Sequence, residues 1–250
     1  MRHPKIFLFK LELCLNRVEV KLKIAVISDI HSNLEAFQAV LNHMGKVDQI
    51  LCIGDFVGYG AKPNEVIELI KHLKMTAVMG NHDYASLTND TSGFNPYAAE
   101  AAHYTHQALS KESKSFLTRL PQVVEIEIKG YKFYLAHGSP RDPLNEYIFP
   151  GTDEKLLKEF LASTGADILL LGHTHIPLFV KIKKGLVLNP GGVGQPRDYD
   201  PRASYVIFTI NNRKWSFKNY RVEYAVSKTA SEILAAGLPS ILAERLYYGQ

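Results

Sequence analysis

In "LKIAVISDIHSNLEAFQAVLNHM", residues 22–44, a strand, a turn and a helix follow one another. Residues 22–30 form an apolar, β-rich run that ends in a polar turn, which predicts a buried strand. Residues 33–44 then place apolar side chains at helical spacing. The same order continues in "QILCIGD" (49–55), "PNEVIELIKHL" (63–73) and "MTAVMGNHD" (75–83). This alternation of strands and helices predicts parallel βαβ units with a buried sheet.

The chain beyond these units changes character. Residues 84–120 are polar at first and then helical, which predicts a cap-like helical insertion beside the site. After Pro121, "VVEIEI" and "KFYLAHG" predict a hairpin, and the helix "DEKLLKEFLAST" leads to the strand "ADILLLGHTH". Three more β-like runs follow: "LFVKIKKGLVLNPG", "ASYVIFTI" and "KWSFKNYRV". We therefore expect a second, more antiparallel sheet, and two sheets flanked by helices give a four-layer α/β/β/α sandwich of the α/β (α+β) class.

Composition and charge favour one globular domain over residues 21–250. The chain has 250 residues with 46% hydrophobic content, enough to bury a substantial core, and no linker or repeat divides it. Six basic and two acidic residues in the first 23 positions account for the whole formal charge of +4, so the rest of the chain is neutral. Stable binding of nucleic acid is therefore not expected. No apolar run is long enough to cross a bilayer, and we expect a cytoplasmic protein.

Residues 1–20 precede the globular pattern and read as an N-terminal extension. Lys10 and Glu12 interrupt its apolar run and no small-residue cleavage site follows, so a signal peptide is not favoured. An added strand, a flexible arm and translation from an upstream start are the alternatives for this segment. The two cysteines, Cys14 and Cys52, are too few for a disulfide framework.

Residues with metal-ligand chemistry stand at the ends of five successive strands. Each lies beside a glycine or a turn, where the backbone can crowd around a small ligand. These residues are Asp29, His31, Asp55, Asn81, His82, His137, His173 and His175. One histidine or aspartate at a strand end is ordinary, whereas the same chemistry at five ends indicates a shared site.

The types of ligand narrow the choice of metal. Structural zinc sites prefer four thiolate or imidazole ligands, and no cysteine takes part here. An all-oxygen set would favour Mg²⁺ or Ca²⁺, whereas mixed imidazole, carboxylate and amide ligands suit Mn²⁺, Fe²⁺, Zn²⁺, Co²⁺ or Ni²⁺. The set is too large for one ion and fits two ions that lie roughly 3.5–4 Å apart and share a carboxylate and a water.

The series "DIH", "GD", "GNHD", "AHG" and "GHTH" resembles the motif series of the calcineurin-like metallophosphoesterase superfamily. Four longer stretches are similar to its small prokaryotic branch of phosphodiesterases and diadenosine-tetraphosphatase-like hydrolases. They are "DIHSNLEAFQAVL", "GDFVGYGAKPNEVI", "AHGSPRDPLNEY" and "LNPGGVGQPRD". The fold of the superfamily is the α/β/β/α sandwich that the strand pattern also predicts.

The resemblance implies a role for each ligand. Asp29, His31 and His175 would hold one metal, Asn81, His137 and His173 would hold the second, and Asp55 would bridge them. His82 would face the scissile phosphate as the catalytic residue. The implied reaction is attack on phosphorus by a hydroxide that bridges two divalent cations, with Mn²⁺ the most favoured metal.

The substrate that the resemblance implies is a small phosphodiester or a nucleotide-type phosphoanhydride. Candidate substrate contacts are Tyr59, Tyr84, Asn95, Arg141 and Arg197, which offer aromatic, amide and guanidinium groups. Gly58 and Tyr59 stand where phosphoprotein phosphatases of the superfamily carry an acidic residue and an arginine, which argues against that activity. A phosphomonoesterase and a catalytically silent binding or scaffold protein are the alternatives. A homo-oligomer is compatible with the sequence.

Overall fold

The computed structural model describes residues 21–73, 75–183, 185–212 and 214–250. The expected N-terminal extension, residues 1–20, lies outside the described residues, and Cys14 lies outside with it. Cys52 is buried as a free thiol.

The predicted βαβ units form the parallel part of the first sheet. They comprise β1 (Leu22–Ile27), α1 (Leu34–Met44), β2 (Gln49–Cys52), α2 (Pro63–Lys71) and β3 (Met75–Ala77). α1 begins after Asn33, whose side chain accepts a hydrogen bond from the Ala36 N–H. α2 begins with a proline, which is favoured at the first helical position. Both helices therefore start where local capping chemistry predicts.

Two long strands complete the first sheet. β9 (Ala203–Asn211) pairs antiparallel with β1, and β10 (Lys214–Val222) pairs antiparallel with β9, which gives the order β10-β9-β1-β2-β3. The expectation that both runs belong to the second sheet was wrong. An alternating pattern predicts a strand with one buried face, but it does not specify which free sheet edge the strand joins. Packing decides this, because Val206, Phe208 and Ile210 fill the space between the sheets.

The second sheet is mixed. Its strands are β4 (Val123–Ile128), β5 (Tyr131–Ala136), β6 (Ile168–Leu170), β7 (Leu178–Ile182) and β8 (Gly185–Asn189), in the order β4-β5-β6-β8-β7. The β4–β5 hairpin and the β7–β8 pair are antiparallel, whereas β5, β6 and β8 are parallel. α6 (Glu154–Thr164) connects β5 to β6 and is capped by Asp153.

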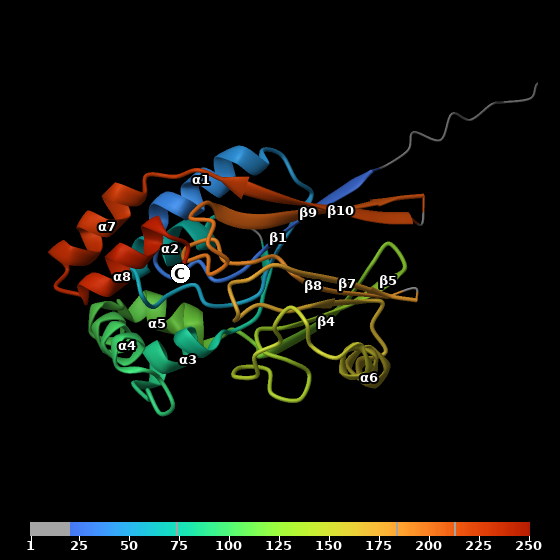
Figure 1. Ribbon diagram of the computed structural model, residues 1–250, viewed down its shortest axis with the longest axis horizontal. Helices are drawn as coiled ribbons and strands as arrows, with labels where there is room; N and C mark the ends of the chain where they lie inside the picture. The colour runs from blue at the N-terminus through green and yellow to red at the C-terminus, as the bar shows by residue number, and fades with distance from the viewer. Residues whose placement is uncertain (1–20, 74, 184, 213) are drawn as a thin grey trace, which may run out of the picture.

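Figure 1 shows the two sheets face to face, with α1 and α2 outside the first sheet and α6 outside the second. The space between the sheets is apolar. Val26, Leu51, Phe133, Leu170 and Phe208, drawn from both sheets, are buried in one cluster there. Burial of this apolar surface, at about 25 cal/mol per Å², holds the layers together. The expected four-layer α/β/β/α sandwich is confirmed.

The remaining helices lie at one end of the sandwich (Figure 1). They are α3 (Asn81–Thr88), α4 (Pro96–Ala108) and α5 (Lys111–Thr118) in the expected insertion, and α7 (Val226–Ala235), α8 (Ser240–Glu244) and the 3-10 helix η1 (Arg245–Tyr247) after β10. The last three helices were not expected from the sequence. Ala101 of α4 packs with Ile233 and Leu246, so the C-terminal helices support the insertion. Among the described residues, no helix combines the length and apolar character needed to span a bilayer.

Candidate metal centre

All of the predicted metal ligands are buried, with exposed fractions between 0% and 7%. Asp29 and His31 follow β1, Asp55 follows β2, Asn81 begins α3, His137 follows β5, and His173 and His175 follow β6. Asn81 and the adjacent His82 therefore belong to a helix, not to the loop that the strand pattern predicts. The fold gathers side chains from both sheets at the strand ends.

One group of potential ligand atoms comes from Asp29, His31, Asp55 and His175, and these atoms lie within 4.8 Å of one another. The Nε2 atoms of His31 and His175 are 3.1 Å apart. His175 Nε2 is 3.3 Å from Asp29 Oδ1, and His31 Nε2 is 3.4 Å from Asp55 Oδ2. Two carboxylates and two imidazoles thus converge in the interior of the protein.

A second group consists of Asp55, His137 and His173. His137 Nε2 lies 3.2 Å from Asp55 Oδ2 and 3.1 Å from Asn81 Oδ1, so the Asn81 amide adjoins this group. Asp55 belongs to both groups, and its Oδ2 faces one histidine from each. This position suits the bridging role that the resemblance implies for Asp55.

Three carboxylate oxygens in these groups lack hydrogen-bond partners. Asp29 Oδ1, Asp29 Oδ2 and Asp55 Oδ2 are buried and unsatisfied within the described part of the chain. Burying a charged oxygen without compensation costs roughly several kcal/mol. A divalent cation supplies the missing interactions, and transition metals accept this mixture of carboxylate and imidazole ligands. The cluster of Asp and His residues is therefore suited to binding metal ions.

Backbone carbonyls fix the orientation of three histidine rings. Nδ1 of His31 lies 3.1 Å from the Val57 oxygen, Nδ1 of His137 lies 2.7 Å from the Ile53 oxygen, and Nδ1 of His175 lies 2.5 Å from the Gln195 oxygen. Since a carbonyl oxygen can only accept, each Nδ1 carries a proton and donates it. The Nε2 atoms, which face the ligand groups, are then the nitrogens available to a metal.

The backbone is left-handed at five of the ligand positions. The φ angles are +54° at Asp29, +50° at His31, +54° at Asp55, +67° at His173 and +59° at His175. This conformation costs roughly 1 kcal/mol or more for a residue other than glycine, and it concentrates at functional sites. Its effect is visible in "GHTH", where His173 and His175 reach different ligand groups within one turn.

Two glycines make room for functional side chains. A Cβ atom at Gly80 would lie 2.0 Å from Asp55 Oδ1, although φ at Gly80 is −100°, which any residue can adopt. A Cβ atom at Gly58 would lie 2.6 Å from His82 Nδ1, and φ there is +91°. The positions of Asp55 and His82 therefore require that these two residues have no side chain.

From the sequence, two roles for Asp83 are equally compatible: it could orient His82, or it could stand in a surface turn. It does neither, because it is fully buried and accepts hydrogen bonds from three main-chain groups. Its Oδ1 accepts from the N–H groups of Phe56 and Val57, and its Oδ2 accepts from Gly80 N–H. Asp83 thus ties the turn after Asp55 to the start of α3.

Charges within the two groups shift one another's pKa. Burial raises the pKa of Asp29 to about 7. Burial also opposes ionisation of Asp55, but His137 and His31 outweigh it and hold the pKa of Asp55 well below its usual range. For His137 the Asp55 carboxylate outweighs burial and raises the pKa to about 9. A metal ion competes with these protons, because it needs the same lone pairs.

His82 lies beside the centre without belonging to either ligand group. Its main-chain N–H donates to Asp55 Oδ1 at 2.9 Å, and its ring packs against Tyr59, Phe94 and His31 with centroids 4.3, 4.6 and 4.9 Å away. Burial lowers its pKa to about 4, although the charge of Asp55 acts in the opposite direction. Its Nδ1 faces Gly58 and is buried without a hydrogen-bond partner among the described residues, which leaves Nε2 as the nitrogen available to a ligand.

A family model described as the calcineurin-like phosphoesterase superfamily domain matches residues 22–213. The chain belongs to this superfamily. This confirms the resemblance of the five motifs, and the two ligand groups formed by those motifs are the candidate metal centre of a metallophosphoesterase.

The similarity of this metallophosphoesterase to other proteins covers nearly its whole chain. The chain is 40% identical to an uncharacterised protein of Methanocaldococcus jannaschii, over 92% of this chain and 100% of that protein. A metallophosphoesterase structure from Sphaerobacter thermophilus is 36% identical with a TM-score of 0.79, over 92% of this chain and 100% of that chain. A hypothetical protein from Pyrococcus horikoshii has a TM-score of 0.81 at 23% identity, over 92% of this chain and 99% of that chain, and shares the fold.

Two of the predicted substrate contacts lie at the candidate centre of this metallophosphoesterase. Tyr59 is 5% exposed, and its ring centroid is 4.7 Å from that of His31. Arg197 Nη2 donates to the Tyr59 hydroxyl at 3.2 Å, and the guanidinium carbon lies 5.5 Å from the centre of the Tyr59 ring. Tyr59 therefore connects Arg197 to the ring of a predicted metal ligand.

The other three predicted contacts have different surroundings. Tyr84 is 40% exposed on α3. Asn95 caps α4, since its side chain accepts from the Ala98 N–H at 3.0 Å. Arg141 pairs with Glu146, and its guanidinium carbon lies 5.3 Å from the centre of the Phe160 ring. These contacts give Asn95 and Arg141 structural roles, and a role of all three in binding substrate stays a prediction.

Two further residues near the candidate centre, Arg245 and Tyr147, were not among the substrate contacts predicted from the sequence. The guanidinium carbon of Arg245 lies 5.7 Å from the centre of the Tyr59 ring, and burial together with the charge of Arg197 lowers its pKa to about 10. No local pattern marks Arg245, because packing of the C-terminal helices brings it to Tyr59. The ring of Tyr147 lies 3.8 Å from that of His173. Tyr147 stands in "AHGSPRDPLNEY", and that motif could have pointed to it.

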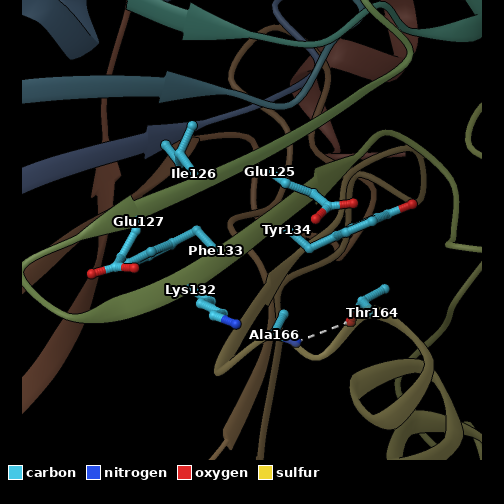
Figure 2. Close-up of a pocket in the computed structure, with 8 residues that line it drawn as sticks. All are labelled: Glu125, Ile126, Glu127, Lys132, Phe133, Tyr134, Thr164 and Ala166. Carbon is cyan, nitrogen blue, oxygen red and sulfur yellow. Dashed lines mark hydrogen bonds between the residues drawn. The ribbon is translucent and has the colours of Figure 1, made fainter.

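A hollow of about 230 Å³ lies apart from the candidate centre, against β4, β5 and the end of α6 (Figure 2). Glu125, Glu127, Lys132 and Tyr134 line it, together with Thr164 and three apolar side chains. None of these residues belongs to either ligand group. The candidate metal centre at the strand ends therefore shares no residue with this hollow.

Proposed function

We propose that this protein is a binuclear metal-dependent phosphoesterase that hydrolyses a small phosphodiester or a nucleotide-type phosphoanhydride. The observation that carries the proposal is the position of Asp55. This carboxylate is common to both ligand groups, and its Oδ2 has no hydrogen-bond partner among the described residues. Membership of the phosphoesterase superfamily supports hydrolysis of a phosphoester at the level of the family.

Two divalent transition-metal ions are the proposed cofactors. Asp29, His31 and His175 would hold one, Asn81, His137 and His173 the other, and Asp55 both. Mn²⁺ is the metal that we favour, and Fe, Zn, Ni and Co suit the same ligand types. When bound, the two cations activate water for in-line attack and offset the charge of the phosphoryl oxygens.

His82, once protonated, is the proposed donor to the departing oxygen of the substrate, or it stabilises the charge on an equatorial phosphoryl oxygen. The rings of Tyr59 and Phe94 hold its imidazole, and the hydrogen bond from its N–H to Asp55 Oδ1 holds its main chain. Since Nδ1 faces Gly58, Nε2 is the atom that would interact with substrate. A fixed imidazole loses little conformational freedom when the substrate binds.

Arg197 and Arg245 are proposed to hold phosphoryl oxygens. Both guanidinium groups lie on the Tyr59 ring, and neither makes an ion pair with a carboxylate side chain in the part of the chain that the structure describes. Guanidinium groups recognise phosphate through paired charge-assisted hydrogen bonds. Two such groups on one side of the centre suit a substrate with more than one negative charge.

Two alternatives differ from this proposal in testable ways. A catalytically silent scaffold would tolerate loss of ligands or of His82, whereas this chain retains them all. A phosphomonoesterase would prefer substrates with a terminal phosphate. A cytoplasmic location and the absence of stable nucleic-acid binding stay predictions from the sequence.

Metal analysis and hydrolysis assays test the proposal together. The purified protein should contain about two transition-metal ions per chain. With Mn²⁺ it should hydrolyse bis-p-nitrophenyl phosphate faster than p-nitrophenyl phosphate. Asp55→Asn keeps the size of the side chain but removes its charge, and should release metal and lower activity by about 100-fold or more. A folded, metal-loaded protein without activity on phosphodiesters or phosphoanhydrides would refute the proposal, and faster monoester hydrolysis would favour the phosphomonoesterase.

A further inference from the structure

Two half-exposed aromatic rings stand next to the candidate metal centre. Tyr147 and Phe149 are 49% and 47% exposed, and their ring centroids are 5.5 Å apart with an angle of 4° between the planes. The ring of Tyr147 also stacks on the imidazole of His173, with centroids 3.8 Å apart and planes at 24°. A column of stacked rings therefore leads from a predicted metal ligand to the protein surface.

Ile148 explains why both rings face outward. This residue lies between them in the chain, is 3% exposed and packs in the apolar cluster beneath α6. Exposure alternates along this segment, because Tyr147 and Phe149 on either side of the buried Ile148 are half-exposed. Burial of Ile148 therefore turns Tyr147 and Phe149 toward solvent, where neither ring contributes to the core.

The loop that carries the two rings is tied to the metal centre by hydrogen bonds. The Asn145 carbonyl oxygen accepts from His173 Nε2 at 3.2 Å. Glu146 accepts hydrogen bonds from the Ser139 hydroxyl and from the Arg141 guanidinium group. The rings thus have a fixed position relative to His173, so a ligand that binds them loses little affinity to loop ordering.

Large apolar side chains left exposed beside a polar site indicate a ligand with a complementary flat surface. We propose that Tyr147 and Phe149 form an aromatic platform on which the nucleobase of the substrate stacks while its phosphate lies at the metal centre. This inference rests on the proposed function and adds a substrate class, namely nucleoside phosphoesters or phosphoanhydrides rather than sugar phosphates. Arg197 and Arg245 supply positive charge for the phosphates of such a substrate.

Binding of two ligands that differ only in the base tests the aromatic platform. The ligands are adenosine 5′-monophosphate and ribose 5-phosphate, titrated calorimetrically into the Mn²⁺-loaded protein. We expect the nucleotide to bind about tenfold more tightly, which is typical of base stacking on an aromatic ring. The double variant Tyr147→Ala/Phe149→Ala should lose this preference and bind ribose 5-phosphate as before. Tyr147→Phe keeps the stacking ring and should keep the preference.

Control variants separate the aromatic platform from general effects. Tyr97 is 51% exposed on α4 and makes no ring contact or side-chain hydrogen bond among the described residues, so Tyr97→Ala should change neither affinity. Phe149→Ala should lose part of the preference even if the double variant binds less metal, because Phe149 stacks on Tyr147 and not on His173. Metal content and the thermal midpoint are measured for every variant.

Three results would overturn the aromatic platform. They are equal affinity of the wild-type protein for the two ligands, no measurable binding of the nucleotide, and an unchanged preference in both Phe149→Ala and the double variant. The proposed function fails on a different measurement, the absence of phosphoester hydrolysis by the loaded protein. If the metal-loaded protein hydrolyses no phosphoester but still binds the nucleotide more tightly than ribose 5-phosphate, the aromatic platform is supported and the proposed function is refuted.

Discussion

The two carboxylate oxygens of Asp55 face different groups: one contacts the main chain of His82, and the other faces the candidate metal centre. Its Oδ1 accepts a hydrogen bond from the main-chain N–H of His82 at 2.9 Å, whereas its Oδ2 is buried, lacks a hydrogen-bond partner among the described residues and lies 3.2 Å from His137 Nε2. The residue proposed to bridge the metals thus also holds the residue proposed to act on the leaving group. Because the hydrogen bond is to the main chain, a change of the His82 side chain should leave Asp55 in place.

His82→Ala should therefore separate metal binding from turnover. Alanine keeps the N–H that Asp55 accepts, so we expect the metal content to stay at the wild-type value. Loss of the proposed proton donor should lower kcat by about 10²–10⁴-fold. Elemental analysis and steady-state kinetics with a phosphodiester measure the two effects. His106→Ala is the matched control, since His106 lies on α4 and contacts the Ser86 carbonyl oxygen. Release of metal by His82→Ala would assign His82 to the ligands instead.

Gly80→Ala should displace Asp55 while the backbone dihedral angles of residue 80 remain in an allowed region. With φ of −100°, Gly80 already has a conformation open to alanine, but the added Cβ would lie 2.0 Å from Asp55 Oδ1. Asp55 must move, so we expect loss of metal and a drop in activity of about tenfold or more.

Gly45→Ala serves as the control for Gly80→Ala, because here the backbone conformation is unfavourable for alanine whereas the space for its Cβ atom is free. Its Cβ would meet nothing within 4 Å, but φ is +59°. It should lower the free energy of unfolding by about 1 kcal/mol and leave the metal content unchanged. Equal metal content in the two variants would contradict the steric account of Gly80.

The candidate metal ligands could be predicted from the sequence because residues with ligand chemistry stand at strand ends, and strand ends can be recognised from apolar runs. Asp29 and His31 follow such a run directly. The backbone conformation that aims them could not be read. Both residues have φ near +50°, which is uncommon for residues other than glycine even though Asp and His adopt it more often than most, and no sequence pattern marks where it occurs. The sequence thus predicts the candidate ligands, whereas their geometry depends on the assembled fold.

Packing between distant segments accounts for the parts that were not predicted. β9 pairs with β1 instead of joining the second sheet, and its alternating pattern is compatible with either edge. Arg245 reaches Tyr59 only because α8 and η1 pack against α4 and α7. Short amphipathic helices such as α8 carry a weak pattern, so their position is specified by the surface that they cover.

Arg245→Ala tests the role of the C-terminal helices in substrate binding. Arg245 shares the Tyr59 ring with Arg197, and both are proposed to hold phosphoryl oxygens. Loss of one charge-assisted contact should raise KM for a nucleotide substrate about tenfold and leave metal content unchanged. Arg202→Ala is the control, because Arg202 is half-exposed and paired with Asp200. An unchanged KM in Arg245→Ala would show that this guanidinium group only supports the fold.

Glu35 anchors a network of ion pairs between α1, α2 and α7. Its Oε1 lies 2.8 Å from Lys62 Nζ and 3.0 Å from Lys228 Nζ, and Lys62 also pairs with Glu232. Burial opposes the charge of Glu35, but Lys62 and Lys228 outweigh it and lower its pKa from 4.5 to about 2. A pKa that is lower in the folded protein stabilises the fold above pH 4.5. That contribution is lost as the pH falls from 4.5 toward 2.

Glu35→Gln should therefore destabilise the protein in a pH-dependent manner. We expect the free energy of unfolding to fall by about 1–2 kcal/mol at pH 7, an amount reduced by solvent around the lysines, and the difference from the wild type to shrink below pH 4.5. Denaturant unfolding at several pH values measures this. Glu68→Gln removes the exposed pair with Lys71 and should cost about 0.5 kcal/mol or less. A Glu35→Gln difference that stays constant down to pH 2.5 would mean that Glu35 acts through packing, because a charge effect must disappear as the carboxylate is protonated.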